Sequence, residues 1–403
     1  MTTISNALRE VQAVKADSEM DSSGTDSIKI IFEEAVDTLS FDEIYICKGD
    51  EGIASVDTER EITGSGLEWI VPVAICTEGT VMLSVDKVGI SAKPIAVNVE
   101  KQKLDSYGYR PNGYDSANWM RRLADSTDLR KISMPGTHDS ATYGVIDADV
   151  PDMARCQYQS KNITQQLKDG IRFFDLRVGS DGKLHHGHVI CYDSYPNGPV
   201  TIEKVFNNIV AFLDGHPGET VLVLIKHEYG DNTHDYLEYV NSAINRHRDR
   251  VYTGTSTHLK LSDIRNKIVL LDGGGNLGKG INASAMHGGS WGNNGTIYWQ
   301  NFYDIGDWTM TVNKRAELKA HEVKVFNENI IKYDTAGSLL CFNWWNKAWN
   351  VGTSVLYYAG KIESYFYGKW NGRGKLYYPQ GVQIMDYYNN DLVYEVIESN
   401  WNS

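Results

Sequence analysis

The stretch KISMPGTHDSATYG, residues 131–144, has a counterpart downstream in IRFFDLRVGSDGKLHHGHV, residues 171–189. Each stretch opens with a short apolar run that predicts a β-strand and then passes into polar residues. In the first stretch Pro135 and Gly136 interrupt the run just before His138. Rigid folds commonly carry their reactive side chains where a strand ends. The two stretches therefore predict two strand ends that share a reacting site.

Helical and extended patterns alternate through the rest of residues 118–403. Apolar residues recur at helical spacing from Ile202 to Leu213, and the run ETVLVLIKHEY, residues 219–229, predicts a buried strand. Alternation of this kind is typical of an α/β fold with a parallel sheet, and an irregular TIM-type (β/α) barrel fits the length. A barrel would collect on one face the charged residues that fall late in the predicted strands, namely Asp139, Asp175, Arg177, Lys226, Glu228 and Asp386.

The chain before the barrel predicts a smaller, separate domain. Residues 1–25 are polar and predict a flexible leader. Residues 26–103 hold short apolar segments divided by turns such as KGDEG, which is typical of a small all-β sandwich. Residues 104–117 are rich in Gly, Tyr and Pro and predict a linker, and residues 118–403 predict the barrel. The sequence leaves open whether residues 26–103 form a binding module or a structural appendage.

Charge and hydropathy exclude some classes of partner. The net charge is −13, and residues 1–105 hold nine Lys and Arg against twenty Asp and Glu. An acidic domain of this kind is not drawn to nucleic acid or to anionic lipid. Mean hydropathy is −0.38 and no long uncharged apolar stretch occurs, so we expect no transmembrane helix. The N-terminus MTTISNALREVQAVKADSEM shows none of the features of a signal peptide.

The cysteines leave the redox compartment open. The chain has 5 Cys and no CxxC motif, which gives no support to a zinc ribbon or a thioredoxin-type site. Cys47 and Cys76 fall on two predicted strands and could be bridged in an oxidising compartment.

The polar residues of the two stretches suit acid–base chemistry. His138 stands beside Asp139, Arg177 follows Asp175 by two positions, and His186 belongs to the motif LHHGH. One histidine can take a proton from an attacking hydroxyl, another can give a proton to a leaving oxygen, and an arginine can hold the phosphoryl oxygens between them. A single histidine at a strand end is more often structural, so the prediction depends on the set.

A metal site is the competing interpretation of the same residues. The HHGH histidines together with Asp175 or Glu228 could bind zinc or calcium. Neighbouring residues of one strand point to opposite faces, however, and this opposes convergence on one ion.

In this order, PGTHDS, FFDLR and LHHGH resemble the X-domain motifs of bacterial-type phosphatidylinositol-specific phospholipase C, over roughly Asn118 to the C-terminus. The resemblance implies an enzyme that cleaves phosphatidylinositol to diacylglycerol and 1,2-cyclic inositol phosphate, and it leaves open whether glycosyl-phosphatidylinositol anchors are a further substrate. It implies that His138 is the general base, oriented by Asp386. It also implies that His186 is the general acid, assisted by Asp139.

The same resemblance bears on metal and substrate. Arg177 stands where calcium-dependent relatives carry a ligating carboxylate, which implies an enzyme without a metal or other cofactor. Lys226 and Glu228 match residues that hold inositol hydroxyls, and Tyr303 matches an aromatic residue that stacks on the inositol ring. Asn301 stands where the family has an aspartate, and a family arginine is replaced around residues 272–273. The headgroup preference therefore stays open.

Aromatic residues late in the chain predict contact with a membrane. Trp344, Trp345 and Trp349 favour an interfacial loop, with packing in the barrel wall as the alternative. The resemblance implies phosphatidylinositol at a membrane surface as the partner, and secretion as the localisation, with a cytoplasmic location as the alternative. Two rival functions stay open: a metal-dependent phosphodiesterase for glycerophosphodiesters or sphingolipids, and a non-catalytic lipid-binding or toxin-like module.

Overall fold

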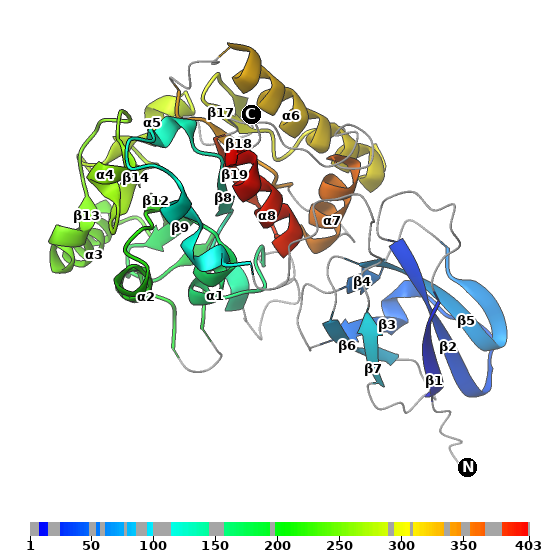
Figure 1. The fold of residues 1–403 in the computed structure, drawn as a ribbon. Coiled ribbons are helices and arrows are strands. Elements are labelled where there is room, and N and C mark those ends of the chain that lie inside the picture. The colour runs from blue at the N-terminus through cyan, green and yellow to red at the C-terminus, as the bar shows by residue number, and fades with distance from the viewer. Residues whose placement is uncertain are drawn as a thin grey trace.

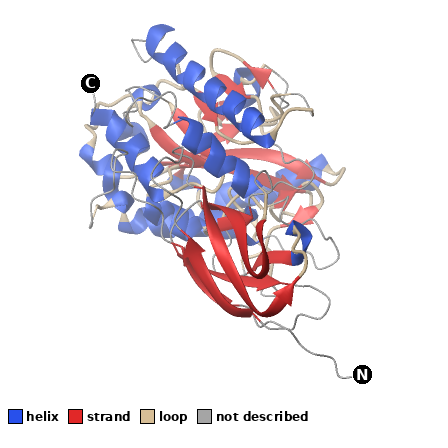
Figure 2. Cartoon of the chain, turned by 90° about the vertical axis from the view of Figure 1, so that its right-hand side faces the viewer, coloured by secondary structure: helices blue, strands red, loops and turns tan. Residues whose placement is uncertain are grey.

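The computed structural model describes most of the chain in two units. It describes residues 8–14, 25–47, 54–56, 61–75, 79–85, 95–99, 114–144, 157–193, 198–288, 294–306, 309–333, 339–347, 355–366 and 381–401. In Figures 1 and 2 the N-terminal unit is a cluster of strands beside a larger unit that carries the long helices.

The N-terminal unit is built from two antiparallel sheets. The first has the order β1-β2-β5-β4 and the second the order β3-β6-β7. Buried apolar side chains such as Ile30, Trp69 and Leu83 come from both sheets. The strands are β1 (Leu8–Val14), β2 (Thr25–Val36), β3 (Ile44–Cys47), β4 (Ala54–Val56), β5 (Thr63–Ile75), β6 (Gly79–Val85) and β7 (Ile95–Val99).

The prediction of a flexible leader was wrong for residues 8–14. These residues form β1, which pairs with β2 from Leu8 against Phe32 to Val14 against Ser27. The segment LREVQAV is less polar than the rest of residues 1–25, and its backbone polar groups are paired with those of β2. The side chains of Cys47 and Cys76 lie outside the described residues, so the predicted bridge stays a prediction.

The larger unit is a curled parallel sheet, as predicted. Its strands follow the order β14-β12-β9-β8-β19-β18-β17, and every neighbouring pair in this series is parallel. Over the part of the chain that is described, no ladder joins β14 to β17, so the barrel is open there. The strands are β8 (Met134–Thr137), β9 (Phe173–Gly179), β12 (Val221–Tyr229), β14 (Ile268–Asp272), β17 (Trp299–Asn301), β18 (Phe342–Trp344) and β19 (Val382–Met385).

Short strands extend this sheet, and helices cover it. The strands that extend it are β13 (Val251–Tyr252), β15 (Ile281–Asn282) and β16 (Asn294–Gly295). A separate antiparallel pair is formed by β10 (His185–His186) and β11 (Val189–Ile190). The helices are α1 (Ile163–Asp169), α2 (Ile202–Gly215), α3 (Thr233–Arg246), α4 (Leu261–Ile264), α5 (Ala283–Met286), α6 (Val312–Tyr333), α7 (Val355–Tyr365) and α8 (Asn390–Glu398). Figure 1 shows α6 near β17 and β18, and α8 near β19 and β8. None of the helices in the described ranges is both long and apolar enough to cross a bilayer.

Local sequence explains where these helices begin and end. The side chain of Asn162 accepts a hydrogen bond from Gln165 N and caps α1, and Gly170, with φ of 111°, ends that helix in a left-handed conformation. In α2 the side chain of Thr201 caps the first turn. The apolar residues at helical spacing along α2, including Ile202 and Leu213, are buried against the sheet.

The barrel begins earlier than predicted. The Tyr114 hydroxyl donates to Glu398 of α8, and its ring packs edge-on against Tyr394 at 4.8 Å. Ser116 opens a 3₁₀ helix, η2 (Ser116–Arg122). Residues 114–117 therefore pack on the barrel and are not linker, because the aromatic and polar groups of this segment find partners there.

A buried ion pair closes the bottom of the barrel. Arg172 precedes β9, Glu219 precedes β12, and both side chains are fully buried, with Arg172 Nε donating to Glu219 Oε2 at 2.9 Å. Arg172 also donates to the backbone oxygens of Leu167 and Ala117 at 2.8 and 2.7 Å. Glu219 in turn accepts from the backbone N–H of Arg121 at 3.1 Å. The pair thus joins η2 and α1 to two adjacent strands.

Arg172→Leu is expected to lower the free energy of unfolding by about 3–5 kcal/mol, because it leaves the Glu219 carboxylate buried without its counter-charge. Equilibrium urea unfolding followed by tryptophan fluorescence measures the loss. Adding Glu219→Gln to the leucine variant should recover part of it, because the uncompensated charge is then removed. A loss below about 1 kcal/mol would contradict the assignment of the pair as a structural element.

Candidate active site

His138 and Asp386 follow two paired strands. The register that sets Met385 of β19 against Thr137 of β8 brings the next residue of each strand side by side. His138 Nδ1 lies 2.7 Å from Asp386 Oδ1, and both side chains are buried. Burial raises the pKa of Asp386 above its ordinary value, although His138 acts in the opposite direction. The pair is the one that the sequence predicted for a base and its orienting carboxylate.

Arg177 fixes the tautomer of His138. Its Nη2 lies 2.7 Å from His138 Nε2, and a guanidinium can only donate. His138 Nε2 must therefore be the unprotonated acceptor, and Nδ1–H donates to Asp386. This leaves a ring nitrogen with a lone pair that is directed toward Arg177.

A second histidine–carboxylate pair lies on the other side of Arg177. His186 of β10 hydrogen-bonds through Nδ1 to Asp139 Oδ2, and Arg177 Nη1 lies 3.3 Å from the same oxygen. Burial acts to raise the pKa of Asp139, but Arg177 and His186 hold it well below its usual range. His186 Nδ1 is thereby occupied, and Nε2 is the ring nitrogen available for reaction.

Asp139 is held in a strained backbone conformation. Its φ of 47° lies in the left-handed region that residues with a Cβ seldom adopt. Asp139 N donates to Asp175 Oδ2 at 3.0 Å, and Thr142 Oγ1 donates to Asp139 O at 2.7 Å. Strain of this kind persists only where the surroundings fix it, and it is common where a side chain must be aimed at a reacting group.

Charged residues from β9 and β12 complete the site. Arg177 Nη2 lies 3.2 Å from Asp175 Oδ2, and Arg177 Nη1 lies 3.5 Å from Glu228 Oε1. Burial acts to lower the pKa of Arg177, but its carboxylate neighbours hold it well above the ordinary value. Lys226 Nζ lies 2.7 Å from Glu228 Oε2, so these two residues share one face of β12, as predicted. Burial and the nearby Arg177 lower the pKa of Lys226.

Two aromatic rings enclose His138. Tyr158 and Trp344 both meet its imidazole edge-on, with centroid distances of 4.7 and 5.6 Å. Trp344 and Trp345 are almost fully buried, so their prediction as membrane-interface residues was wrong. Trp344 lies on β18 and faces the barrel interior, where it also packs on Trp299 at 5.1 Å. Trp349 lies outside the described residues.

Sequence reasoning missed the segment that holds the two strand ends together. Gln159 is fully buried, and its Nε2 donates to His138 O at 2.8 Å and to Met385 O at 2.9 Å. One amide thus joins the backbone beside the base to the backbone beside Asp386. A buried glutamine just before a predicted helix carries no periodic signal, so only the folded chain reveals this role.

The two remaining predicted substrate residues lie on another strand. Asn301 ends β17 and is buried, and Tyr303 follows it and is half-buried. In a parallel sheet this end of β17 belongs to the same edge as the ends of β8 and β9. The contact of Asn301 and Tyr303 with inositol stays a prediction.

The geometry opposes the metal interpretation of the HHGH motif. His185 points to Asp181, with Nε2 to Oδ1 at 3.0 Å, and its ring stacks on Tyr229. His186 points the other way, to Asp139. The two neighbours diverge as alternation on a strand requires, and the position between the carboxylates of Asp139, Asp175 and Glu228 is filled by the guanidinium of Arg177.

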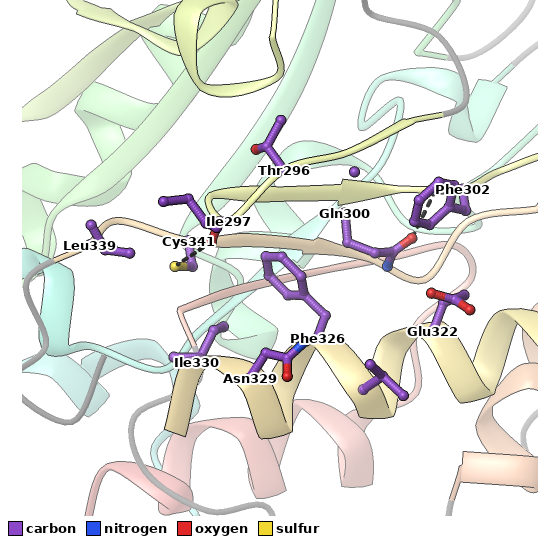
Figure 3. A pocket seen from close by; sticks show the side chains of 12 residues that line it. Thr296, Ile297, Gln300, Phe302, Glu322, Phe326, Asn329, Ile330, Leu339 and Cys341 are labelled. Carbon is purple, nitrogen blue, oxygen red and sulfur yellow. Dashed lines mark hydrogen bonds between the residues drawn. The ribbon is translucent and has the colours of Figure 1, made fainter. Parts of the chain in front are cut away.

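A cavity of about 320 Å³ lies elsewhere, between β17 and α6 (Figure 3). Apolar side chains such as Ile297, Phe326 and Ile330 form most of its described lining, with Glu322 beside them. It includes none of the predicted site residues. We therefore place the reacting centre at the histidine pairs around Arg177 and not in this cavity.

Comparison with known proteins shows what this chain is similar to. Residues 132–272 match the family model described as phosphatidylinositol-specific phospholipase C, X domain. The matched range holds His138, His186 and Arg177.

Two curated relatives carry the name 1-phosphatidylinositol phosphodiesterase. The protein from Listeria monocytogenes is 31% identical over 166 residues, which is 40% of this chain and 50% of the relative. The protein from Staphylococcus aureus strain Newman is 29% identical over 194 residues, or 45% of this chain and 58% of the relative. The matched part of the chain thus spans about half the length of these curated relatives.

Solved structures show the same fold. The phosphatidylinositol-specific phospholipase C from Listeria monocytogenes aligns with a TM-score of 0.54 at 21% identity, covering 71% of this chain and 98% of that one. A variant of the Staphylococcus aureus enzyme aligns with a TM-score of 0.57 at 23% identity, covering 72% and 98%. The larger unit is therefore the TIM-type barrel of the bacterial enzymes.

Proposed function

We propose that this protein is a phosphatidylinositol phosphodiesterase that needs no metal ion. The observation that carries the proposal is the arrangement of two histidine–carboxylate pairs, His138–Asp386 and His186–Asp139, on either side of Arg177. The named activity of the relatives from Listeria and Staphylococcus supports the choice of substrate.

The chemistry runs through the Nε2 atoms of the two histidines. Arg177 Nη2, which contacts His138 Nε2 in the free protein, turns to the bound phosphate. His138 Nε2 then takes the proton of the inositol 2-hydroxyl as its oxygen forms a bond to phosphorus. The bond between phosphorus and the glycerol oxygen breaks, and that oxygen takes the proton from His186 Nε2. Diacylglycerol leaves, and the 1,2-cyclic inositol phosphate remains. Because the nucleophile belongs to the substrate, the reaction gains the high effective molarity of an intramolecular step.

Arg177 supplies the charge stabilisation in this scheme. A guanidinium donates two parallel hydrogen bonds to phosphate oxygens, and it is already fixed by Asp139, Asp175 and Glu228. Lys226 and Glu228, at the same edge, present a cation and a carboxylate to the hydroxyls of the inositol ring. The substrate requires peripheral contact with a membrane and fits a secreted protein, but the buried Trp344 and Trp345 do not provide that contact.

The test is cleavage of phosphatidylinositol in mixed micelles with and without EDTA, followed by ³¹P NMR. We expect cleavage that changes less than about twofold with EDTA, a cyclic phosphodiester as first product, and no cleavage of phosphatidylcholine, which lacks an internal hydroxyl. Activity that EDTA removes and calcium restores would mean that a metal acts beside Arg177. Cleavage only of glycerophosphodiesters or sphingomyelin would favour the rival enzyme, and no cleavage at all would favour a lipid-binding module.

A further inference from the structure

Tyr158 contacts both histidines of the site. Its ring centroid lies 4.7 Å from that of His138 and 4.8 Å from that of His186. Its hydroxyl oxygen lies 3.4 Å from His186 Nε2. The side chain is 6% exposed, and a buried phenol usually places its hydroxyl on a hydrogen-bonding partner. None of the three motifs that identify the X domain includes this residue.

The backbone of Tyr158 is fixed at both of its polar groups. Tyr158 N donates to Thr142 Oγ1 at 3.0 Å, just after the loop that carries Asp139. Tyr158 O accepts from the N–H of Tyr387 at 2.8 Å, next to Asp386. The ring of Tyr158 therefore has little freedom to move relative to the two strand ends, and it can limit the motion of the imidazoles that it contacts.

Of the two histidines, His186 is the one whose imidazole is less firmly held by its other contacts. Its side chain is 24% exposed, whereas that of His138 is 7% exposed and is held at both ring nitrogens. Asp139 holds only Nδ1 of His186, so the imidazole could swing about that bond. A contact at Nε2 and along the ring face limits this motion at the atom that must reach the leaving oxygen.

We propose that Tyr158 is a positioning residue for the leaving-group step, whose hydroxyl and ring hold His186 Nε2 toward the departing oxygen. The proposal rests on the proposed function, in which His186 gives the proton to glycerol. Geometry within tenths of an ångström matters for proton transfer, so a small gain of freedom at His186 lowers the rate. The hydroxyl does not itself exchange a proton with substrate in this scheme.

The experiment compares Tyr158→Phe with the wild type on two inositol phosphodiesters. One is phosphatidylinositol, and the other is a synthetic ester whose leaving group is 4-nitrophenol. We expect kcat for phosphatidylinositol to fall about five- to tenfold, the effect of one lost hydrogen bond, with KM within about twofold. On the nitrophenyl ester the loss should stay below about twofold, because nitrophenolate departs without help from an acid. Tyr236→Phe, a buried tyrosine of α3 stacked on His227, is the matched control and should match the wild type on both substrates.

An equal loss of kcat on both substrates, or no loss on either, would overturn the proposal. Neither result is expected if Tyr158 acts on the leaving-group step. A second measurement does not depend on turnover: the ¹⁵N resonance of His186 Nε2 in the substrate-free protein should shift in Tyr158→Phe and not in Tyr236→Phe. If the wild type cleaves neither ester, the proposed function is wrong, and only the NMR measurement bears on the contact between Tyr158 and His186. In that case a His186 Nε2 resonance that is unchanged in Tyr158→Phe overturns the contact, and a shifted resonance supports it.

Discussion

His138→Ala is expected to lower the turnover of phosphatidylinositol by about 10²- to 10⁴-fold, the range of a lost general base. The reason is that His138 Nε2 is the acceptor beside Arg177, in a pocket closed by aromatic rings. Release of water-soluble inositol phosphate at saturating substrate, in the presence of EDTA, measures the loss.

The variant should still fold, since burial already raises the pKa of Asp386 and its carboxyl can become neutral when the histidine is removed. His185→Gln is the matched control. It lies in the second predicted stretch but contacts Asp181 and Tyr229, so activity within about threefold of the wild type is expected. An alanine variant that keeps more than a tenth of the activity would show that another group is the base.

The common location of several site residues could be predicted because the sequence shows where buried strands end. An apolar run that stops at a polar residue marks the end of a buried strand, and parallel strands end at one edge of the sheet. That reasoning is enough to bring His138, Asp175, Arg177 and Asp386 to one place. The pairing of His138 with Asp386 needs in addition the register between β8 and β19, which no local pattern sets and which the resemblance to a known family implied.

Tyr158 and Trp344 show where such reasoning ends. Tyr158 stands in the irregular segment before α1, and its position depends on contacts with Thr142 and Tyr387 that are distant in the sequence. Trp344 belongs to an aromatic-rich region whose composition suits a membrane surface and a barrel core equally. Only the side of β18 on which it lies decides between them, and a strand of three residues is too short to show alternation.

Arg177→Leu is expected to lower kcat for phosphatidylinositol by about 10³-fold, because it removes the donors that oppose the charge developing on the phosphoryl oxygens. Arg177→Lys should lose about 10²-fold. Lysine keeps the charge and its neighbours Asp139 and Glu228 but lacks the two-pronged geometry. Comparing kcat of the two variants at saturating substrate separates the contribution of the positive charge from that of the guanidinium geometry. Equal activity of the lysine variant and the wild type would mean that a point charge is sufficient.

The same leucine variant should also become less stable, and the loss should depend on pH. In the wild type, burial acts to raise the pKa of Asp139 and Glu228, and Arg177 is the strongest of the groups that hold both below their ordinary values. These carboxylates therefore contribute stability that is present above their unfolded-state pKa of about 4 and is lost only as the pH falls through the lower folded-state pKa.

Without Arg177 the positive charge that counteracts the effect of burial is lost, so the pKa values of Asp139 and Glu228 rise. The charged forms of both carboxyl groups then destabilise the folded state at neutral pH. We expect the leucine variant to lose about 3 kcal/mol of unfolding free energy at pH 7 and clearly less at pH 5, where protonation removes the uncompensated charge. Urea unfolding of wild type, Arg177→Leu and Arg177→Lys at the two pH values measures this difference. The lysine variant, which keeps the positive charge, should show a smaller loss and little dependence on pH. A loss in the leucine variant that is the same at pH 5 and pH 7 would mean that packing, and not the charge of Arg177, holds these carboxylates in place.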